Sequence, residues 1–502
     1  MHNVHSDCDI LVIGGGINGA GIARDAAGRG FKVILCEQHD LAAHTSSAST
    51  KLIHGGLRYL EYGEFRLVQK ALAEREVLLA AAPHISWPLR FVLPHEPHLR
   101  PAWIIRIGLF LYDHLARRHT LSSSQTINLA EHPTGEPLRR ASGTAFMYSD
   151  AWVDDARLVV LNAIDAQARG AQIHTRTRCK RLELNGHLWQ ATLTNSTQRT
   201  SIITARSVIN ATGPWAGIFL EQCTKITASH AVRLVKGSHI VVPALFSHDC
   251  AYLFQNSDKR IIFAIPYEQH YTLIGTTDVD YEGDPAAVKI SAAEELYLCS
   301  VASHYFKKTI TSTDIIYRYA GVRPLLKDEA LDPASVTRDY SFELDTAGAP
   351  LLTVLGGKLT TYRRLAEEAL AHLKPLLGNQ KPGWTHSVPL PGGDLGARHY
   401  EQFHEEMSRE YPAFPKTMLD RWCRAYGTRL KLMLNGARTL AELGVEVLPE
   451  LYDTEIRYLV THEWARTAED ILWRRSKLGL HLPKNASHLL DQWLADYKNS
   501  TD

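Results

Sequence analysis

The chain has 502 residues, more than one ordinary hydrophobic core can organise, so the sequence predicts two or three globular domains. Its 55 lysine and arginine residues nearly balance 54 aspartate and glutamate residues. This balance excludes the strongly basic surface of a nucleic-acid-binding protein. The seven cysteines form no C-x-x-C pair and no metal-like cluster, so we expect reduced thiols and no metal site.

A glycine-rich turn separates the first predicted strand, residues 9–13, from the first predicted helix, residues 20–29. Glycines there permit a tight turn and a close approach of the backbone to a pyrophosphate, which a helix N-terminus attracts. A second strand, residues 32–36, leads into Glu37, an acid placed to bind a ribose 2′-hydroxyl. The whole βαβ unit predicts a dinucleotide site; the alternative is a merely tight strand-to-helix turn.

Later segments indicate how the chain is organised. A polar loop at 44–51 and a glycine-containing stretch at 53–59 are candidate ligand-lining loops, and a helix at 64–82 stops before Pro83. Prolines and serines between 94 and 140 predict an insertion outside the first sheet. A helix from Asp155 to about 169, a strand at 171–177 and a strand at 207–211 return to the dinucleotide domain.

The second half begins with β-rich runs from 232 to about 280, which predict an antiparallel sheet over the substrate. A buried strand at 351–355 turns through glycines into a helix at 362–373, and the segment after 389–393 is predicted to be helical. The expected fold is therefore α/β, with a Rossmann-like domain, an antiparallel-sheet substrate domain and a C-terminal helical domain. The expected boundaries are 1–83, 151–231 and 341–386 for the Rossmann-like domain, 84–150 for an insertion or cap, 232–340 for the substrate-binding sheet and 394–502 for the helical domain.

Nine motifs are spread over nearly the whole chain: IGGGINGAGIARDAAGRG, TSSASTKLIHGGLRYLE, YSDAWVDDARLV, NATGPWA, KGSHIVV, IGTTDV, AGVRPL, GGKLTTYR and LWRRSKLGL. Together they resemble the FAD-dependent glycerol-3-phosphate dehydrogenases, specifically the aerobic respiratory enzymes of bacteria. The resemblance implies a tightly bound FAD, oxidation of sn-glycerol 3-phosphate to dihydroxyacetone phosphate, and transfer of electrons to membrane quinone.

The same resemblance assigns residues to the cofactor. Glu37 would bind the adenosine ribose, Cys179 would contact adenine through its backbone, and residues 357–360 would meet the isoalloxazine near N1 and O2. A helix N-terminus there would stabilise the negative charge of the reduced flavin. The full expected set is Gly14, Gly15, Gly16, Asn18, Gly19, Glu37, Ser46, Ser47, Ser49, Cys179, Ala211, Gly213, Gly357, Lys358, Leu359 and Thr360.

Glycerol 3-phosphate requires cations for its phosphate and a base for its C2 hydroxyl, while the C2 hydride goes to flavin N5. Arg58 and Arg323 are the expected phosphate ligands, because a guanidinium binds phosphate with two parallel hydrogen bonds; a structural ion pair is the alternative for each. Lys358 would serve either phosphate or flavin, and Tyr59 would donate a hydroxyl or only pack.

The base is expected to be a histidine, since its pKa lies near neutrality. His54 and His239 lead, because both lie in the motifs, with a structural role or a flavin hydrogen bond as the alternative for either one. The expected catalytic set is thus His54, His239, Arg323 and Lys358. Rival functions are an oxidase that passes electrons to oxygen and a FAD-fold binding protein without redox chemistry.

The expected partners are glycerol 3-phosphate, membrane quinone and the inner face of the cytoplasmic membrane, without nucleic acid; a homodimer is left open. We expect a cytoplasmic, peripheral protein, because the first strand leaves no room for a signal peptide and no apolar run is long enough to span a bilayer. Residues 101–118 are the candidate membrane contact, and a helix packed inside the insertion is the alternative. Its apolar residues are Trp103, Ile104, Ile107, Phe110, Leu111 and Leu115, near the arginines Arg100, Arg106, Arg117 and Arg118.

Overall fold

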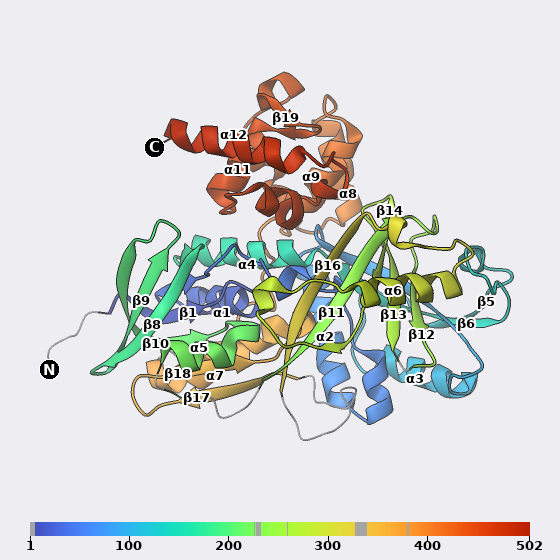
Figure 1. Ribbon diagram of the computed structural model, residues 1–502, viewed down its shortest axis with the longest axis horizontal. Coiled ribbons are helices and arrows are strands. Elements are labelled where there is room, and N and C mark those ends of the chain that lie inside the picture. The colour runs from blue at the N-terminus through green and yellow to red at the C-terminus, as the bar shows by residue number, and fades with distance from the viewer. Residues whose placement is uncertain are drawn as a thin grey trace.

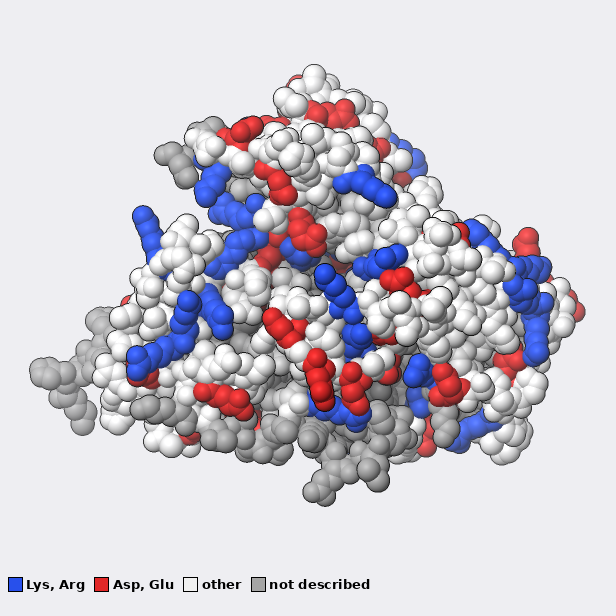
Figure 2. Space-filling model, in the orientation of Figure 1, with Lys and Arg blue, Asp and Glu red and all other residues white. Residues whose placement is uncertain are grey.

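The computed structural model describes residues 6–224, 226, 232–258, 260–326, 339–378 and 381–501. Two sheets lie side by side, and a C-terminal helical domain sits against them (Figure 1). The predicted fold class, α/β with an antiparallel substrate domain and a C-terminal helical domain, is confirmed. On the face that Figure 2 shows, acidic and basic side chains are interspersed, as the balanced composition predicts.

The first sheet is Rossmann-like. Its central strand β1 is parallel to its neighbours β2 and β10, and β10 is parallel to β18, so the carboxyl ends of these strands share one edge. Side chains alternate between two cores: α1, α4 and α7 cover one face, and α5 with the β8–β9 hairpin covers the other. The strands are β1 (Cys8–Ile13), β2 (Val33–Cys36), β7 (Gln172–His174), β8 (Thr177–Asn185), β9 (Leu188–Asn195), β10 (Thr200–Asn210), β17 (Ser341–Asp345) and β18 (Leu351–Leu355); the helices are α1 (Ile17–Gly28), α4 (Asp155–Ala168), α5 (Ala216–Cys223) and α7 (Tyr362–Leu377).

The second sheet is antiparallel except for the pairing of β4 with β12. Helix α6 packs on one face, and α2 and α3 pack on the other. Its strands are β3 (Leu52–Ile53), β4 (Ser86–Pro94), β5 (Gln125–Asn128), β6 (Thr144–Val153), β11 (Val232–Pro243), β12 (Ala251–Gln255), β13 (Ile261–Tyr267), β14 (Tyr271–Gly275), β15 (Val279–Asp280) and β16 (Tyr317–Leu326); the helices are α2 (Phe65–Ala81), α3 (Ala102–His114) and α6 (Ala292–Tyr305).

Two features of this second sheet differ from the expectation. The predicted insertion and the predicted substrate sheet form one sheet, because β4, from the insertion, pairs with β12. The pattern for 232–340 also did not predict helix α6. Ser291 and Glu294 form a capping box at its first turn, a signal that the β-rich pattern of the preceding segment obscured.

The C-terminal domain has its own hydrophobic core and packs over α4 (Figure 1). It contains α8 (Tyr400–Glu410), α9 (Lys416–Tyr426), α10 (Leu430–Leu434), the short strands β19 (Glu446–Leu448) and β20 (Leu451–Tyr452), α11 (Asp453–His462), a π-helix (Asp470–Arg475) and α12 (Ala486–Thr501). Of the helices that the structure describes, none is long and apolar enough to cross a membrane.

Candidate active site

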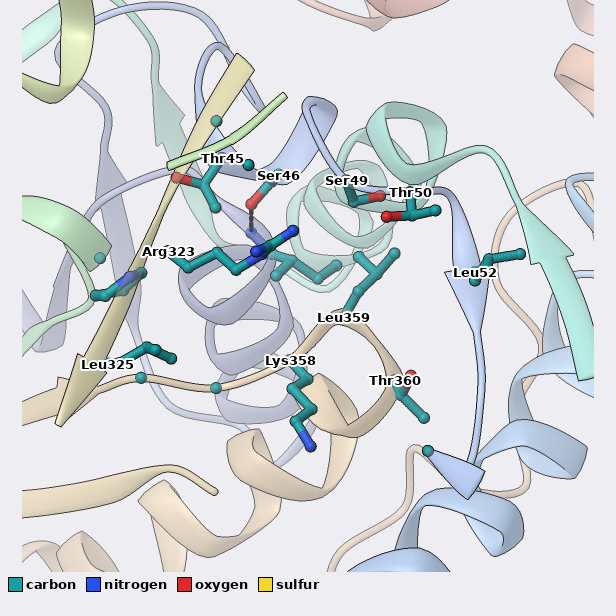
Figure 3. A pocket seen from close by; sticks show the side chains of 18 of the residues that line it. Thr45, Ser46, Ser49, Thr50, Leu52, Arg323, Leu325, Lys358, Leu359 and Thr360 are labelled. Carbon is teal, nitrogen blue, oxygen red and sulfur yellow. Dashed lines mark hydrogen bonds between the residues drawn. The ribbon is translucent and has the colours of Figure 1, made fainter. Parts of the chain in front are cut away.

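A cavity of about 650 Å³ lies between the two sheets, at the carboxyl edge of the Rossmann-like strands. This edge is where ligands bind in such sheets. Figure 3 shows labelled side chains around the cavity from the loop after β2, from β3, from β16 and from the loop before α7: Thr45, Ser46, Ser49, Thr50, Leu52, Arg323, Leu325, Lys358, Leu359 and Thr360. Segments that are far apart in the sequence therefore meet around one space.

The glycines of the turn after β1 have different roles. Gly14 has a φ of +112°, and a Cβ there would lie 2.5 Å from the carbonyl oxygen of Ala211. A Cβ on Gly19 would lie 1.9 Å from the carbonyl oxygen of Gly14, so this glycine permits the packing of α1 against β1. Gly16 lines the cavity, and a Cβ there would meet only the Ser46 hydroxyl, at 3.1 Å.

The start of α1 fits an anionic ligand. Its N-cap, Gly16, provides no side chain to cap the helix, and the Ile17 N–H donates to the Ser46 hydroxyl at 3.0 Å (the dashed line in Figure 3). Asn18 donates its amide to the Gly356 carbonyl at 3.2 Å, and its buried Oδ1 has no hydrogen-bond partner among the described residues. A buried amide oxygen without a partner beside a cavity indicates a ligand donor.

Glu37 lies at the other end of the same turn. Its carboxylate accepts the N–H groups of Gly15 and His39, each at 2.7 Å, and the side chain borders the cavity. Burial raises the pKa of Glu37, whereas the two backbone donors act to lower it. A carboxylate oxygen has more than one acceptor site, so Glu37 retains capacity for a ribose hydroxyl. Together with the glycine turn, these residues fit a dinucleotide.

Most of the expected cofactor residues meet at this cavity. Those that line it are Gly14, Gly16, Asn18, Glu37, Ser46, Ser49, Cys179, Ala211, Gly213, Gly357, Lys358, Leu359 and Thr360. The other three, Gly15, Gly19 and Ser47, do not line the cavity. They belong to the turn and to the loop after β2, where the Ser47 hydroxyl donates to the His44 carbonyl at 3.2 Å. The Ser49 hydroxyl is directed to Asp155, at 2.7 Å, so its side chain orders the loop.

The expected substrate residues border the same cavity. The Lys358 ammonium lies 4.1 Å from the centre of the Tyr59 ring, a cation–π contact that orients both groups. Arg323 forms an ion pair with Asp278 and donates to the Thr276 hydroxyl at 3.0 Å. Its guanidinium is therefore held at the wall by groups that sequence analysis did not single out, although both stand in the motif IGTTDV.

The two candidate bases occupy different environments. His54 lines the cavity directly after β3, and its backbone N–H donates to the Thr360 hydroxyl at 3.3 Å. His239 on β11 is fully buried and does not line the cavity. Its Nε2 is 3.0 Å from the Thr50 hydroxyl, and its ring stacks on Tyr319. Burial lowers the pKa of His239 well below its usual value, so this ring is neutral near neutral pH.

Sequence analysis did not single out Asp150, a buried carboxylate near the loop that contains His54. Asp150 borders the cavity and accepts hydrogen bonds from Arg75 at 2.6 Å and from Tyr112 at 2.7 Å. The Tyr112 hydroxyl also accepts the N–H of Gly55 at 2.8 Å, which fixes the loop that follows His54. The sequence signals were its place in the motif YSDAWVDDARLV and an acidic side chain within the largely apolar strand β6.

The opposite end of the cavity is apolar and reaches α3, where Phe65, Ile104, Ile107 and Leu111 line it. Helix α3 buries Leu109 and Tyr112 but leaves the side chains of Trp103, Ile107 and Phe110 between 51% and 65% exposed. Helix α3 thus packs through one face, as the alternative of a helix packed inside the insertion expects, and leaves these three residues exposed on another. Exposed aromatic and aliphatic side chains in one patch mark an interaction surface.

The structure shows neither a metal cluster nor a disulfide: in the described ranges no three His, Cys, Asp or Glu side chains are grouped to hold a metal ion, and all seven cysteines are free. Burial raises the pKa of the Cys179 thiol to about 12, which makes this cavity-lining cysteine unreactive. The site therefore offers a dinucleotide cradle, cations and two imidazoles, those of His54 and His44. The His44 Nε2 lies 2.8 Å from the His39 Nδ1, and burial lowers the pKa of His44 to about 4.

Comparison with known proteins agrees with this geometry. Residues 9–363 match the family model described as FAD dependent oxidoreductase, and residues 384–497 match the C-terminal domain of alpha-glycerophosphate oxidase. A glycerol-3-phosphate dehydrogenase of Pseudomonas aeruginosa is 53% identical over 97% of this chain and 94% of its own. A D-erythritol 1-phosphate dehydrogenase of Brucella abortus is 50% identical over 97% of both chains. The crystal structure of glycerol-3-phosphate dehydrogenase from Bacillus halodurans complexed with FAD superposes with a TM-score of 0.80, at 28% identity, over 98% of this chain and 90% of that one.

Proposed function

Because the chain belongs to the family of FAD-dependent glycerol-3-phosphate dehydrogenases, we propose that it oxidises sn-glycerol 3-phosphate to dihydroxyacetone phosphate and passes the electrons to membrane quinone. FAD, expected from the resemblance, is confirmed as the cofactor. The observation that carries the proposal is that the dinucleotide turn borders the same cavity as cations and an imidazole suited to the substrate, namely Arg58, Arg323, Lys358 and His54.

The chemistry divides among the residues in the cavity. Bound FAD supplies the acceptor for the hydride that leaves C2 of the substrate. Arg58 and Arg323 bind the phosphate, and Lys358, held on the Tyr59 ring, adds positive charge near the phosphate or the flavin. We assign His54 as the base that takes the C2 hydroxyl proton. We assign the buried His239 as a residue that positions Thr50, which lines the cavity.

A second substrate is supported by the similarity to D-erythritol 1-phosphate dehydrogenase, whose substrate is a longer polyol phosphate. Both substrates present a phosphate to the same cations, so the length of the polyol chain decides between them. Steady-state kinetics with the two compounds and one artificial acceptor tests the choice. We expect a higher kcat/KM for sn-glycerol 3-phosphate; a higher kcat/KM for D-erythritol 1-phosphate would reassign the substrate.

Arg323→Lys is expected to lower kcat/KM for glycerol 3-phosphate about 10- to 150-fold, the effect of losing one charge-assisted hydrogen bond of about 1.5–3 kcal/mol. FAD should stay bound, and oxidation of unphosphorylated glycerol should fall far less. Arg318→Lys is the matched control, because Arg318 lies on the same strand but pairs with Glu295 outside the cavity. An equal loss with glycerol would remove the phosphate role from Arg323.

Electron transfer to a lipid-soluble quinone requires contact with the membrane. The cavity has an apolar end at α3, and α3 presents exposed apolar side chains beside basic ones. Arg106 lies within α3 and donates to the Ser124 hydroxyl at 2.8 Å, and Arg118 follows the helix and pairs with Asp113 at 3.1 Å. This arrangement supports peripheral binding with α3 in the interface, arginines at headgroup level and quinone entry from the apolar end.

Replacing Ile107 and Phe110 together with glutamate is expected to abolish cosedimentation with anionic vesicles, because two charges would enter the interface. The variant should keep FAD and reduce a water-soluble acceptor at the normal rate, but not quinone in vesicles. The control is Leu432→Glu with Val445→Glu, at two exposed apolar positions of the C-terminal domain. Loss of FAD, or vesicle binding equal to that of the control, would contradict the assignment of α3.

The acceptor distinguishes the dehydrogenase from the rival oxidase. With glycerol 3-phosphate as substrate, we expect quinone reduction in vesicles to be faster than oxygen consumption in their absence. Rapid peroxide formation without quinone would favour the oxidase, since the same FAD and substrate residues serve both reactions. Absence of turnover with every acceptor would favour the non-catalytic FAD-fold protein.

A further inference from the structure

The motif LWRRSKLGL lies outside the cavity, at the boundary between the C-terminal domain and the Rossmann-like domain (Figure 1). It places three cations within four residues, Arg474, Arg475 and Lys477, and all three are buried. A buried cation destabilises a fold unless it is paired and hydrogen-bonded. The partners of these residues therefore indicate what the motif does.

Both arginines bind one carboxylate on the loop that lines the cofactor site. Arg475 donates two parallel hydrogen bonds to Asp40, at 2.6 and 2.9 Å, and Arg474 donates a third at 2.8 Å. Asp40 follows Glu37 by three residues, and the Ala42 N–H donates to the Gly15 carbonyl at 3.1 Å. The guanidinium groups thus hold the segment that joins the ribose-binding acid to the glycine turn.

The other end of the same loop is held from α4. Lys477 pairs with Asp154, the N-cap of α4, at 3.2 Å. The next residue, Asp155, accepts the Ser49 hydroxyl and the Lys51 ammonium, each at 2.7 Å. Residues 37–51 are therefore fixed at both ends. The arginines hold the first end through Asp40, and Asp155 of α4 holds the second end through Ser49 and Lys51.

This loop needs an external constraint. Ala42 and Lys51 have φ values of 59° and 60°, a left-handed conformation that costs free energy in residues other than glycine. Between them lie Ala43, His44, Thr45, Ser46, Ala48, Ser49 and Thr50, all of which line the cavity. A two-pronged arginine–carboxylate pair fixes direction as well as distance, so it suits a loop whose shape must be maintained.

We propose that residues 474–477 act as a clamp that holds the FAD-binding loop, residues 37–51, in shape and so slows the release of FAD. Arg474, Arg475 and Lys477 are positioning residues, because they act through Asp40 and Asp154 without bordering the cavity themselves. The proposal depends on FAD binding, which the family shows, and is independent of which substrate is oxidised.

The test is the rate at which FAD leaves the purified holoenzyme, followed by the rise of free FAD fluorescence after dilution. Arg475→Lys and Asp40→Asn each remove hydrogen bonds from the clamp with little change in volume. Both are expected to release FAD at least about tenfold faster than the wild type, the effect of one lost charge-assisted hydrogen bond. Their far-UV circular dichroism should be unchanged.

The matched control is Arg421→Lys. Arg421 forms a similar two-pronged pair with the buried Glu455, at 2.5 and 2.8 Å, within the C-terminal domain and away from the loop, although its own side chain is 14% exposed. Its FAD release should equal that of the wild type. Wild-type release from both clamp variants, or equal acceleration in the control, would overturn the proposal. Aggregation of both clamp variants even in the presence of FAD would also overturn it, because the pair would then be required by the fold itself.

Discussion

His54→Asn is expected to lower kcat about 100- to 10,000-fold, the contribution of a positioned acid–base group, while FAD remains bound. The structure places His54 on the cavity wall, whereas His239, the other candidate, is fully buried behind Thr50. A protonated imidazole cannot accept the substrate proton, so wild-type kcat/KM should fall as the pH drops below the pKa of the base. In His54→Asn this acidic limb of the pH profile should disappear.

His239→Asn provides the comparison for this experiment. Since burial keeps the pKa of His239 well below its usual value, this ring does not change charge near neutral pH. The variant should therefore retain the acidic limb, whatever its kcat. An acidic limb that persists in His54→Asn and vanishes in His239→Asn would transfer the role of the base to His239.

Gly16→Val is expected to abolish retention of FAD, because the branched side chain would occupy space needed by the pyrophosphate. The protein should still fold: Gly16 has an ordinary φ of −79°, and its Cβ would meet only the flexible Ser46 hydroxyl at 3.1 Å. The measurement is the flavin-to-protein absorbance ratio after purification, together with circular dichroism. In the wild type, acid precipitation should release the flavin, since we expect it to be bound noncovalently.

Substitutions at two other glycines serve as comparisons for Gly16→Val. Gly217→Val, in the first turn of α5, meets nothing within 4 Å and should retain FAD. Gly19→Val would place a Cβ 1.9 Å from the Gly14 carbonyl and should disrupt the packing of α1, so its loss of FAD carries no information on the pyrophosphate. A yellow, fully loaded Gly16→Val protein would mean that the dinucleotide lies elsewhere in the cavity.

The parts of this fold that could be predicted are those specified locally. Strand β1, the glycine turn, α1 and β2 follow one another within 30 residues, and each has its own local signal. The pairing of β4 with β12 joins residues that are far apart in the chain, and no local pattern encodes it. The same holds for the site, where Asp278 restrains Arg323 and Tyr112 restrains Gly55 through contacts that only the folded chain creates.

Besides these long-range contacts, the sequence could not show which side chains are buried. His54 and His239 both stand in motifs, and only the structure separates an imidazole on the wall from one behind it. Likewise, three cations in LWRRSKLGL have the composition of an exposed helix end, yet they are buried against Asp40 and Asp154. A single sequence shows which residue types are present but not which of them face the solvent.

The central claim is that glycerol 3-phosphate delivers a hydride to FAD in the cavity between the two sheets. It is tested most directly by adding sn-glycerol 3-phosphate to the FAD-loaded protein in the absence of oxygen, and then adding a quinone. We predict that the substrate bleaches the flavin absorbance and that the quinone restores it. A flavin absorbance that stays unchanged with excess substrate, in a protein whose FAD dithionite can reduce, would contradict the claim.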